Sequence, residues 1–368
     1  MSTADATARA RGEALGFAAL VAWLLLTVAL ALPRAIGPGD AGELGTIMLR
    51  GGVPHPPGYP WMRLLGLLSR ALWAVGVPPM IAAALPCALA AAAGWALLAR
   101  ASRRLCPWPV AYATVALVAS AHVVVLHTVE CEVFGPLVLA AAVMVWLAIA
   151  RPLGAIGTGV CLGAAVATHL TAIGLLPLAV AAAWPQQPGA AALLRAGLRG
   201  VVGSALGLLV FATLLVGDGP WRWGEIDTLR GLVDHVLRRD YGTFDLSLHD
   251  ASPGAAAQIG FSLGHHADAW TAGSTDAPLL AAAIAIAVAL GVRAAWPRAH
   301  RSAAIAVGIA WLVVGPGFAS LGDLDPGSPF AAWILERFAV LPLVLATPAL
   351  AVALALAAAR VPAGWPRL

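Results

Sequence analysis

The chain has 368 residues, of which 61% are hydrophobic and 11% are charged, and its mean hydropathy of +0.86 excludes an ordinary soluble domain. The formal charge of +4 comes from arginines in short loops, because the sequence contains no lysine, and this scatter excludes a nucleic-acid-binding stripe. The length suffices for about ten helical crossings of a bilayer and leaves little chain for a separate soluble domain. We therefore expect residues 1–368 to form one transmembrane domain.

Apolar runs that are long enough for helices recur along the whole chain. They cover residues 14–33, 79–99, 107–126, 133–150, 153–184, 200–216, 277–292, 302–320 and 337–359. The first run follows Arg9 and Arg11 and has no clear cleavage site, so it is expected to be a transmembrane helix rather than a signal peptide. The run 153–184 is too long for one crossing and is interrupted at His169, so we expect it to cross twice with a turn there.

Two further segments, 61–75 and 226–237, have apolar residues at helical spacing with arginines between them or nearby. This pattern is typical of interfacial helices that lie flat on the membrane. The predicted fold class is therefore an all-α integral membrane protein, a polytopic bundle of about ten transmembrane helices with interfacial helices in its outer loops.

The arginines also predict the topology, because positive residues in short loops stay on the cytoplasmic side. They recur at residues 9–11, 100–104, 151, 195–199, 293–301 and 360–367. We expect a multi-pass protein of the inner (plasma) membrane with both termini in the cytoplasm. Its extracytoplasmic loops include the first loop, 34–78, and a long loop, 217–276. Nearly every acidic residue beyond the N-terminal tail falls in such loops. The positive-inside rule does not explain this, because Asp and Glu contribute little to it. We therefore expect the extracytoplasmic face to be the active one.

The first outer loop holds two carboxylates, Asp40 and Glu43, at the start of a predicted helix. Three residues apart, they face the same way, and either can act as a general base. Asp40 can equally cap the helix, with Glu43 completing a capping box. The prolines that follow fix the backbone around His55 and Tyr59, so we expect a stiff turn that holds both side chains at a site.

Three more ionisable residues, Glu130, Glu132 and His169, fall at the ends of predicted helices. Such residues are costly at membrane depth unless they face protein or water, which favours a shared polar cavity. His169 can equally be a hydrogen-bonded residue of the turn. The pair His265 and His266 lies in a polar loop, where solvated histidines are more common than metal ligands. No cofactor and no metal site is predicted.

Six motifs, in chain order, resemble those of glycosyltransferase family 117 in the GT-C superfamily. They are DAGEL at 40–44, HPPGYP at 55–60, VECEVF at 129–134, HLT at 169–171, RDYGTF at 239–244 and ERF at 336–338. The likeness runs from about residue 37 to about residue 340. The family includes O-mannosyltransferases of the animal endoplasmic reticulum, and bacterial relatives also belong to it.

This resemblance implies a GT-C bundle whose first extracytoplasmic loop carries a catalytic acid. It implies transfer of a sugar, with mannose expected, from a polyprenyl-phosphate donor to an extracytoplasmic acceptor, either a protein Ser/Thr hydroxyl or a glycan, with inversion at the anomeric carbon. It makes Asp40 the base, with Glu43 as its partner or substitute.

The remaining matched residues are expected to bind substrate. The leaving phosphate needs cations, and Arg239 and Arg337 lie in matched motifs, although an arginine at a helix end can equally snorkel to lipid headgroups. Tyr241 in the same motif as Arg239 is a further substrate-binding candidate, together with His55, Tyr59, Glu130, Glu132 and His169.

Two other functions suit a polar cavity in a helical bundle. One is a lipid or solute transporter, against which stand the missing internal repeat and the lack of broken helices at matched places in two halves. The other is a non-catalytic membrane subunit that binds a lipid-linked sugar, against which the intact Asp40 weighs.

Overall fold

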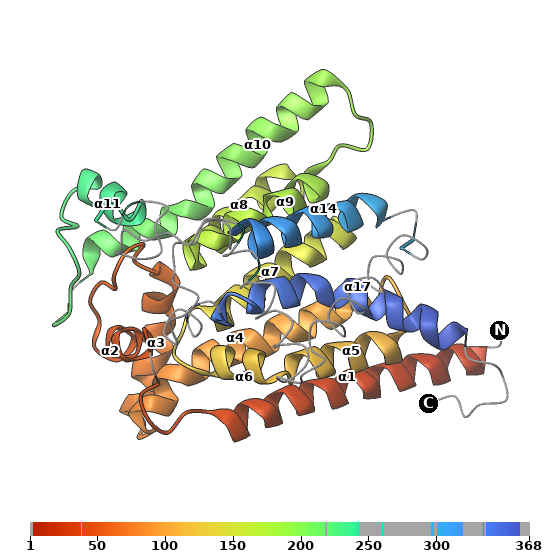
Figure 1. The fold of residues 1–368 in the computed structure, drawn as a ribbon, viewed down its shortest axis with the longest axis horizontal. Helices are drawn as coiled ribbons and strands as arrows, with labels where there is room; N and C mark the ends of the chain where they lie inside the picture. Colours follow the sequence, from red (N-terminus) through yellow and green to blue (C-terminus); the bar gives the residue numbers. More distant parts are fainter. Residues whose placement is uncertain are drawn as a thin grey trace.

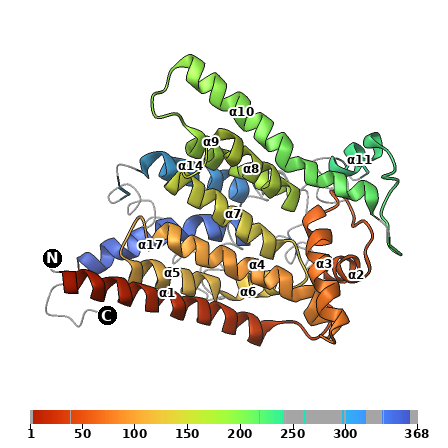
Figure 2. The same cartoon turned by 180° about the vertical axis from the view of Figure 1, so that it is seen from behind.

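The structure is a computed structural model, and it describes residues 3–37, 39–217, 219–240, 242, 256, 260, 296–297, 300–318, 334 and 336–360. Helices run side by side along one long axis, while shorter helices gather at the end opposite the two chain termini (Figures 1 and 2). The long helices of the bundle are α1 (Thr3–Ala31), α4 (Pro79–Ser102), α7 (Phe134–Ala150), α10 (Ala190–Leu208) and α17 (Val340–Ala359). Its shorter helices are α5 (Trp108–Ala119), α6 (His122–Val129), α8 (Ala155–Thr168), α9 (Leu176–Ala183) and α14 (Arg301–Leu312).

Among these described helices, four are long and apolar enough to cross a membrane. They are Asp5–Ala31, Pro79–Ser102, Ala190–Val216 and Val340–Ala359. The expected single helix over 107–126 is wrong, because the chain bends by 69° between α5 and α6. Ala121 is extended at this bend, and Ser120 Oγ accepts a hydrogen bond from Trp23 Nε1 of α1 at 2.8 Å. The expected span 277–292 lies outside the described residues.

The run 153–184 forms the hairpin that its length predicts. α8 leads to His169, and the 3₁₀ helix η1 (Leu170–Leu175) and α9 lead back. Arg151, which precedes α8, donates from Nη2 to the carbonyl oxygen of Ala181 near the end of α9 at 2.6 Å. The end of α9 therefore lies beside the start of α8, so the two helices are antiparallel.

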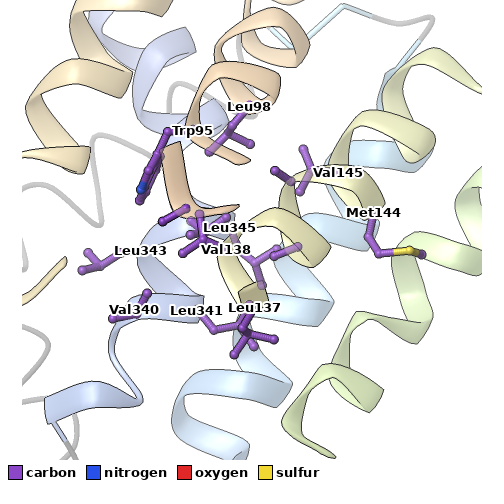
Figure 3. Packing of buried hydrophobic residues seen from close by; sticks show 14 of the residues in the cluster. Trp95, Leu98, Leu137, Val138, Met144, Val145, Val340, Leu341, Leu343 and Leu345 are labelled. Atoms are coloured by element: carbon purple, nitrogen blue, oxygen red, sulfur yellow. The ribbon is translucent and has the colours of Figure 1, made fainter. Parts of the chain in front are cut away.

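Close contacts between small residues hold this hairpin to α10. A Cβ atom added to Gly159 of α8 would lie 2.2 Å from the carbonyl oxygen of Gly200, and one added to Gly203 of α10 would lie 2.1 Å from that of Ile156. The two backbones therefore touch, as small residues allow for helices packed in lipid. Elsewhere the core is made of larger side chains from α4, α7 and α17, including Trp95, Leu137 and Leu343 (Figure 3).

The two ends of the bundle differ in chemistry. Near the termini, Arg103, which follows α4, donates to Glu13 of α1 at 2.7 Å, and His300 lies near Arg104 and Arg151. The helices α2 (Ala41–Arg50), α3 (Pro60–Ala74) and α11 (Leu229–Val236) cover the opposite end (Figure 1). The expected interfacial segments 61–75 and 226–237 thus form helices α3 and α11, and α3 leaves apolar side chains such as Leu67 exposed.

Candidate active site

Asp40 and Arg337 meet at the end of the bundle that α2 and α3 cover. Asp40 occupies the N-cap position of α2, but its side chain makes no capping hydrogen bond. It accepts a hydrogen bond instead from Arg337 Nη1, 3.1 Å from Oδ2, with the side chains of Asp40 and Arg337 33% and 13% exposed. The capping interpretation of Asp40 is therefore not met, and its carboxylate faces the site.

Arg337 also faces a second carboxylate. Its Nη1 lies 3.6 Å from Glu132 Oε1, and its guanidinium lies over the ring of Phe134, 5.9 Å from the centroid. The Glu132 side chain is only 3% exposed. Burial raises the pKa of Glu132 to about 8, and the charge of Asp40 adds to this effect while Arg337 opposes it. Burial therefore favours the protonated form of Glu132.

Glu130 lies beside the first outer loop. A Cβ atom added to Gly37 would lie 2.6 Å from Glu130 Oε1, so the loop that leads to Asp40 packs closely on this carboxyl group. Burial raises the pKa of Glu130, and the charges of His127 and Arg337 oppose the rise. The two glutamates of the VECEVF motif thus line the same site, as their positions at a helix end predict.

Glu43 contacts His55 rather than Asp40. Its Oε1 accepts the backbone N–H of His55 at 2.7 Å, and its Oε2 lies 2.8 Å from His55 Nδ1. Although burial alone raises the pKa of Glu43, the hydrogen bonds and charge of His55 outweigh it and leave the pKa below its usual value. Glu43 Oε2 thus lies within hydrogen-bond distance of Nδ1, and the other ring nitrogen of His55, Nε2, lies 3.4 Å from the Tyr59 hydroxyl.

Tyr59 lies at the centre of the site. It has a φ of 37°, in the left-handed region that is rare for a bulky residue, and it directly precedes Pro60 at the start of α3. Its ring is buried and stacks on His169, with the centroids 6.0 Å apart. Burial raises the pKa of the Tyr59 phenol, as does the charge of Asp40, while Arg238 and Arg337 lower it. The hydroxyl is thus a neutral hydrogen-bonding group among four charged or acidic side chains.

His169 is a hydrogen-bonded residue of the turn, and its ring also lies against other aromatic rings of the site. Its Nδ1 accepts the backbone N–H of Thr171 at 3.2 Å, which makes it the N-cap of η1. Its ring also contacts the rings of Tyr59, Phe134 and Phe338. The turn of the α8–α9 hairpin therefore contributes an aromatic wall to the site.

The second outer segment docks onto the first. The backbone N–H of Val53 donates to Trp221 O, and that of Trp223 donates to Val53 O, both at 3.0 Å. His235 of α11 lies with Nε2 3.1 Å from Pro54 O, and a Cβ atom added to Gly58 would meet its ring at 3.1 Å. α11 is therefore fixed against the turn that carries His55 and Tyr59.

The two arginines that follow α11 point in different directions. Arg239, which the sequence indicates as a phosphate ligand, pairs with Asp234 at 2.5 Å and is 56% exposed, so the structure does not bring it into the site. Arg238 has a φ of 54°, is partly buried, and its charge acts on both Tyr59 and His169. The sequence motifs point to Arg239 and give no signal for Arg238, which its partial burial and its effect on Tyr59 and His169 reveal. Tyr241 lies outside the described residues.

Within the described ranges, no group of three or more His, Cys, Asp or Glu side chains is arranged to hold a metal ion. His265 and His266 lie outside those ranges.

A solved structure matches nearly the whole chain. The crystal structure of ArnT from Cupriavidus metallidurans bound to undecaprenyl phosphate, a GT-C glycosyltransferase, aligns with a TM-score of 0.60 at 16% identity. The alignment covers 94% of this chain and 60% of that chain. The chain has the GT-C fold. This confirms the predicted fold class and makes the chain a multi-pass membrane protein.

A curated sequence relative agrees with the GT-C assignment. The protein O-mannosyl-transferase TMEM260 of Mus musculus is 30% identical in an alignment 255 residues long, which covers 64% of this chain and 35% of the relative. The chain thus spans about a third of the length of the curated relative that it matches. No family model matches the chain. The resemblance to GT-C glycosyltransferases that the motifs indicate is confirmed by both relatives.

Proposed function

We propose that this GT-C protein transfers one sugar from a polyprenyl-phosphate donor to a hydroxyl group of an acceptor on the extracytoplasmic side of the plasma membrane. One observation carries the proposal: a carboxylate able to take a proton, Asp40, lies 3.1 Å from a guanidinium able to bind a phosphate, Arg337. The undecaprenyl phosphate in the ArnT crystal supports the donor class, and the likeness to an O-mannosyl-transferase supports mannose and a protein Ser/Thr hydroxyl. A glycan hydroxyl would meet the same chemical requirement.

The reaction is a single displacement with inversion. The acceptor oxygen forms a bond to the anomeric carbon while the bond from that carbon to the phosphate oxygen breaks, and the electron pair leaves with the phosphate. Asp40 takes the proton of the acceptor hydroxyl as the new bond forms. The products are the glycosylated acceptor and the polyprenyl phosphate.

Arg337 and Arg238 are the proposed ligands of the leaving phosphate. A guanidinium offers paired N–H donors that match phosphate oxygens and stays charged at any working pH. Negative charge grows on the phosphate as the sugar leaves, so donors held in place stabilise the transition state more than the ground state. Arg238 takes the place of Arg239 in this proposal because Arg239 is paired with Asp234 and exposed.

Glu43 is proposed to position His55 and not to replace Asp40 as the base. By accepting the Nδ1 proton it fixes the tautomer of His55, which in turn orients the hydroxyl of Tyr59. Glu132, in its protonated form, can donate a hydrogen bond to a sugar hydroxyl, with Glu130 and His169 completing the wall of the pocket.

The test is a turnover assay with protein in lipid nanodiscs. Radiolabelled polyprenyl-phosphate mannose and a Ser/Thr-rich acceptor peptide are supplied, and both labelled peptide and released polyprenyl phosphate are measured. We expect equal amounts of both products, and Asp40→Asn should lower turnover about a hundredfold or more, the scale of general-base assistance. Full turnover in Asp40→Asn would remove Asp40 as the base. Movement of the intact donor between leaflets of a vesicle, with no sugar released to any acceptor, would support a transporter instead.

A further inference from the structure

The proposed base and the proposed phosphate ligand bind each other. Arg337 Nη1 donates to Asp40 Oδ2 at 3.1 Å and lies 3.6 Å from Glu132 Oε1. Asp40 has no capping bond to its own helix, so Arg337 provides the side-chain contact that holds its carboxylate. In this arrangement each residue occupies part of the hydrogen-bonding capacity that the other needs for its proposed role.

Each partner weakens the other for catalysis. The lone pair of Asp40 Oδ2 that accepts the hydrogen bond from Arg337 is not available to the acceptor hydroxyl. A guanidinium engaged by carboxylates has fewer donors to offer a phosphate. The pair therefore has to open before Asp40 can take the proton of the acceptor and Arg337 can bind the phosphate of the donor.

We infer that the donor phosphate displaces Asp40 from Arg337, and that this exchange releases the Asp40 carboxylate to act as the base. The inference rests on the proposed function, since it assumes that Arg337 binds the phosphate and that Asp40 takes the acceptor proton. It makes the donor the first substrate to bind, because the acceptor meets a competent base only after the phosphate is in place.

The surroundings of the two residues favour movement of Asp40 rather than of Arg337. Glu336, next to Arg337 in the chain, lies 3.8 Å from the buried His127, and the guanidinium itself lies over the ring of Phe134. Asp40, in contrast, stands in the loop ahead of α2 and is more exposed. The buried Glu132 remains beside Arg337 when Asp40 leaves, so the guanidinium keeps one oxygen neighbour while it receives the phosphate.

The test is a double-mutant cycle on the binding of polyprenyl phosphate alone, measured with protein in nanodiscs. Asp40→Asn removes the carboxylate that competes for Arg337, so we expect the phosphate to bind about three- to tenfold more tightly, a change of about 1 kcal/mol. Arg337→Gln should weaken binding. In the double variant the gain from Asp40→Asn should disappear, because there is no guanidinium to release.

Glu130→Gln is the matched control for simple charge repulsion. Glu130 is a carboxyl group near Arg337 that is not hydrogen-bonded to it, so its removal relieves repulsion without freeing a donor. Its effect should be smaller than that of Asp40→Asn and should be the same with and without Arg337. Asp40→Ser serves in place of Asp40→Asn if the asparagine variant does not fold.

Three results would overturn the inference. If Asp40→Asn leaves phosphate affinity unchanged while Arg337→Gln weakens it, the exchange is wrong but the phosphate site stands. If Asp40→Asn still raises phosphate affinity in the Arg337→Gln background, the gain in affinity comes from relief of charge repulsion and not from release of Arg337. Unchanged affinity in Arg337→Gln removes the phosphate assignment of the proposed function, and the exchange with it.

Discussion

Glu43 binds His55 through both of its carboxylate oxygens, one to the backbone N–H at 2.7 Å and one to the imidazole Nδ1 at 2.8 Å. An amide in place of this carboxylate keeps only one acceptor oxygen, so Glu43→Gln should leave the tautomer of His55 unfixed. We expect turnover to fall about ten- to hundredfold, the scale for a residue that orients another, while donor affinity changes less than about twofold.

The control for Glu43→Gln is Glu13→Gln at the opposite end of the bundle. Glu13 is also paired, with Arg103, so the substitution breaks an ion pair of the same kind far from the site. Its turnover should match that of the unmodified protein. Nitrogen NMR of the His55 ring distinguishes the two tautomers directly, and a single fixed tautomer in Glu43→Gln would contradict the positioning role.

Arg238 and Arg239 provide a matched pair for the phosphate site. Arg238→Ala should weaken polyprenyl-phosphate binding about tenfold, because a partly buried charge near Tyr59 is lost. Arg239→Ala should change it by less than about twofold, since the exposed Arg239 is paired with Asp234 and exposed ion pairs contribute little. Titrations with polyprenyl phosphate at low and high salt measure both effects. A larger loss of affinity in Arg239→Ala than in Arg238→Ala would make Arg239 the phosphate ligand.

The raised pKa of Glu132 predicts a dependence of stability on pH. Its folded pKa of about 8 is above the ordinary value of 4.5 for a glutamate, so the folded state binds more protons than the unfolded state between these values. Stability should therefore fall as pH rises through this window and should level off above about pH 8. Glu132→Gln removes the titration.

Thermal unfolding in detergent, from about pH 6 to about pH 9, measures this dependence. The unmodified protein should lose about 2–4 °C of melting temperature relative to Glu132→Gln over that range. Parallel curves for the two proteins would mean that Glu132 is ionised throughout, held in that state by Arg337.

Labelling of single cysteines tests which face the site occupies. Val75 after α3 and Leu229 at the start of α11 are 78% and 72% exposed, so cysteines there are accessible at the site end of the bundle. In a background without the four native cysteines, an impermeant reagent should modify both in intact cells. A cysteine at the exposed Gln186 should react only after permeabilisation. The opposite pattern would invert the topology.

Hydrophobic length predicts most of the bundle, because it reflects contact with the bilayer, which acts along the chain. The hairpin at His169 follows from the number of apolar residues in the run 153–184. The bend between α5 and α6 does not, since it depends on a contact of Ser120 with Trp23 on another helix.

The contacts within the site, like the contact of Ser120 with Trp23, join residues that are distant in the sequence. The motif positions of Asp40 and Arg337 indicate that both matter, but these residues are 297 positions apart and nothing in their spacing predicts a hydrogen bond. Spacing groups Glu43 with Asp40, yet Glu43 binds His55, which lies twelve residues on. The choice between Arg238 and Arg239 depends on one left-handed backbone conformation that neither residue type favours.

The glycine contacts between α8 and α10 have an effect at a distance. α10 continues through the 3₁₀ helix η2 (Leu209–Val216) into the outer segment that carries α11 and Arg238. Because the backbones touch at Gly159 and Gly203, a single methyl group there would push α10 away from the hairpin. We therefore expect the contact between α8 and α10 to fix the position of Arg238, so that a mutation remote from the candidate site can misplace this side chain.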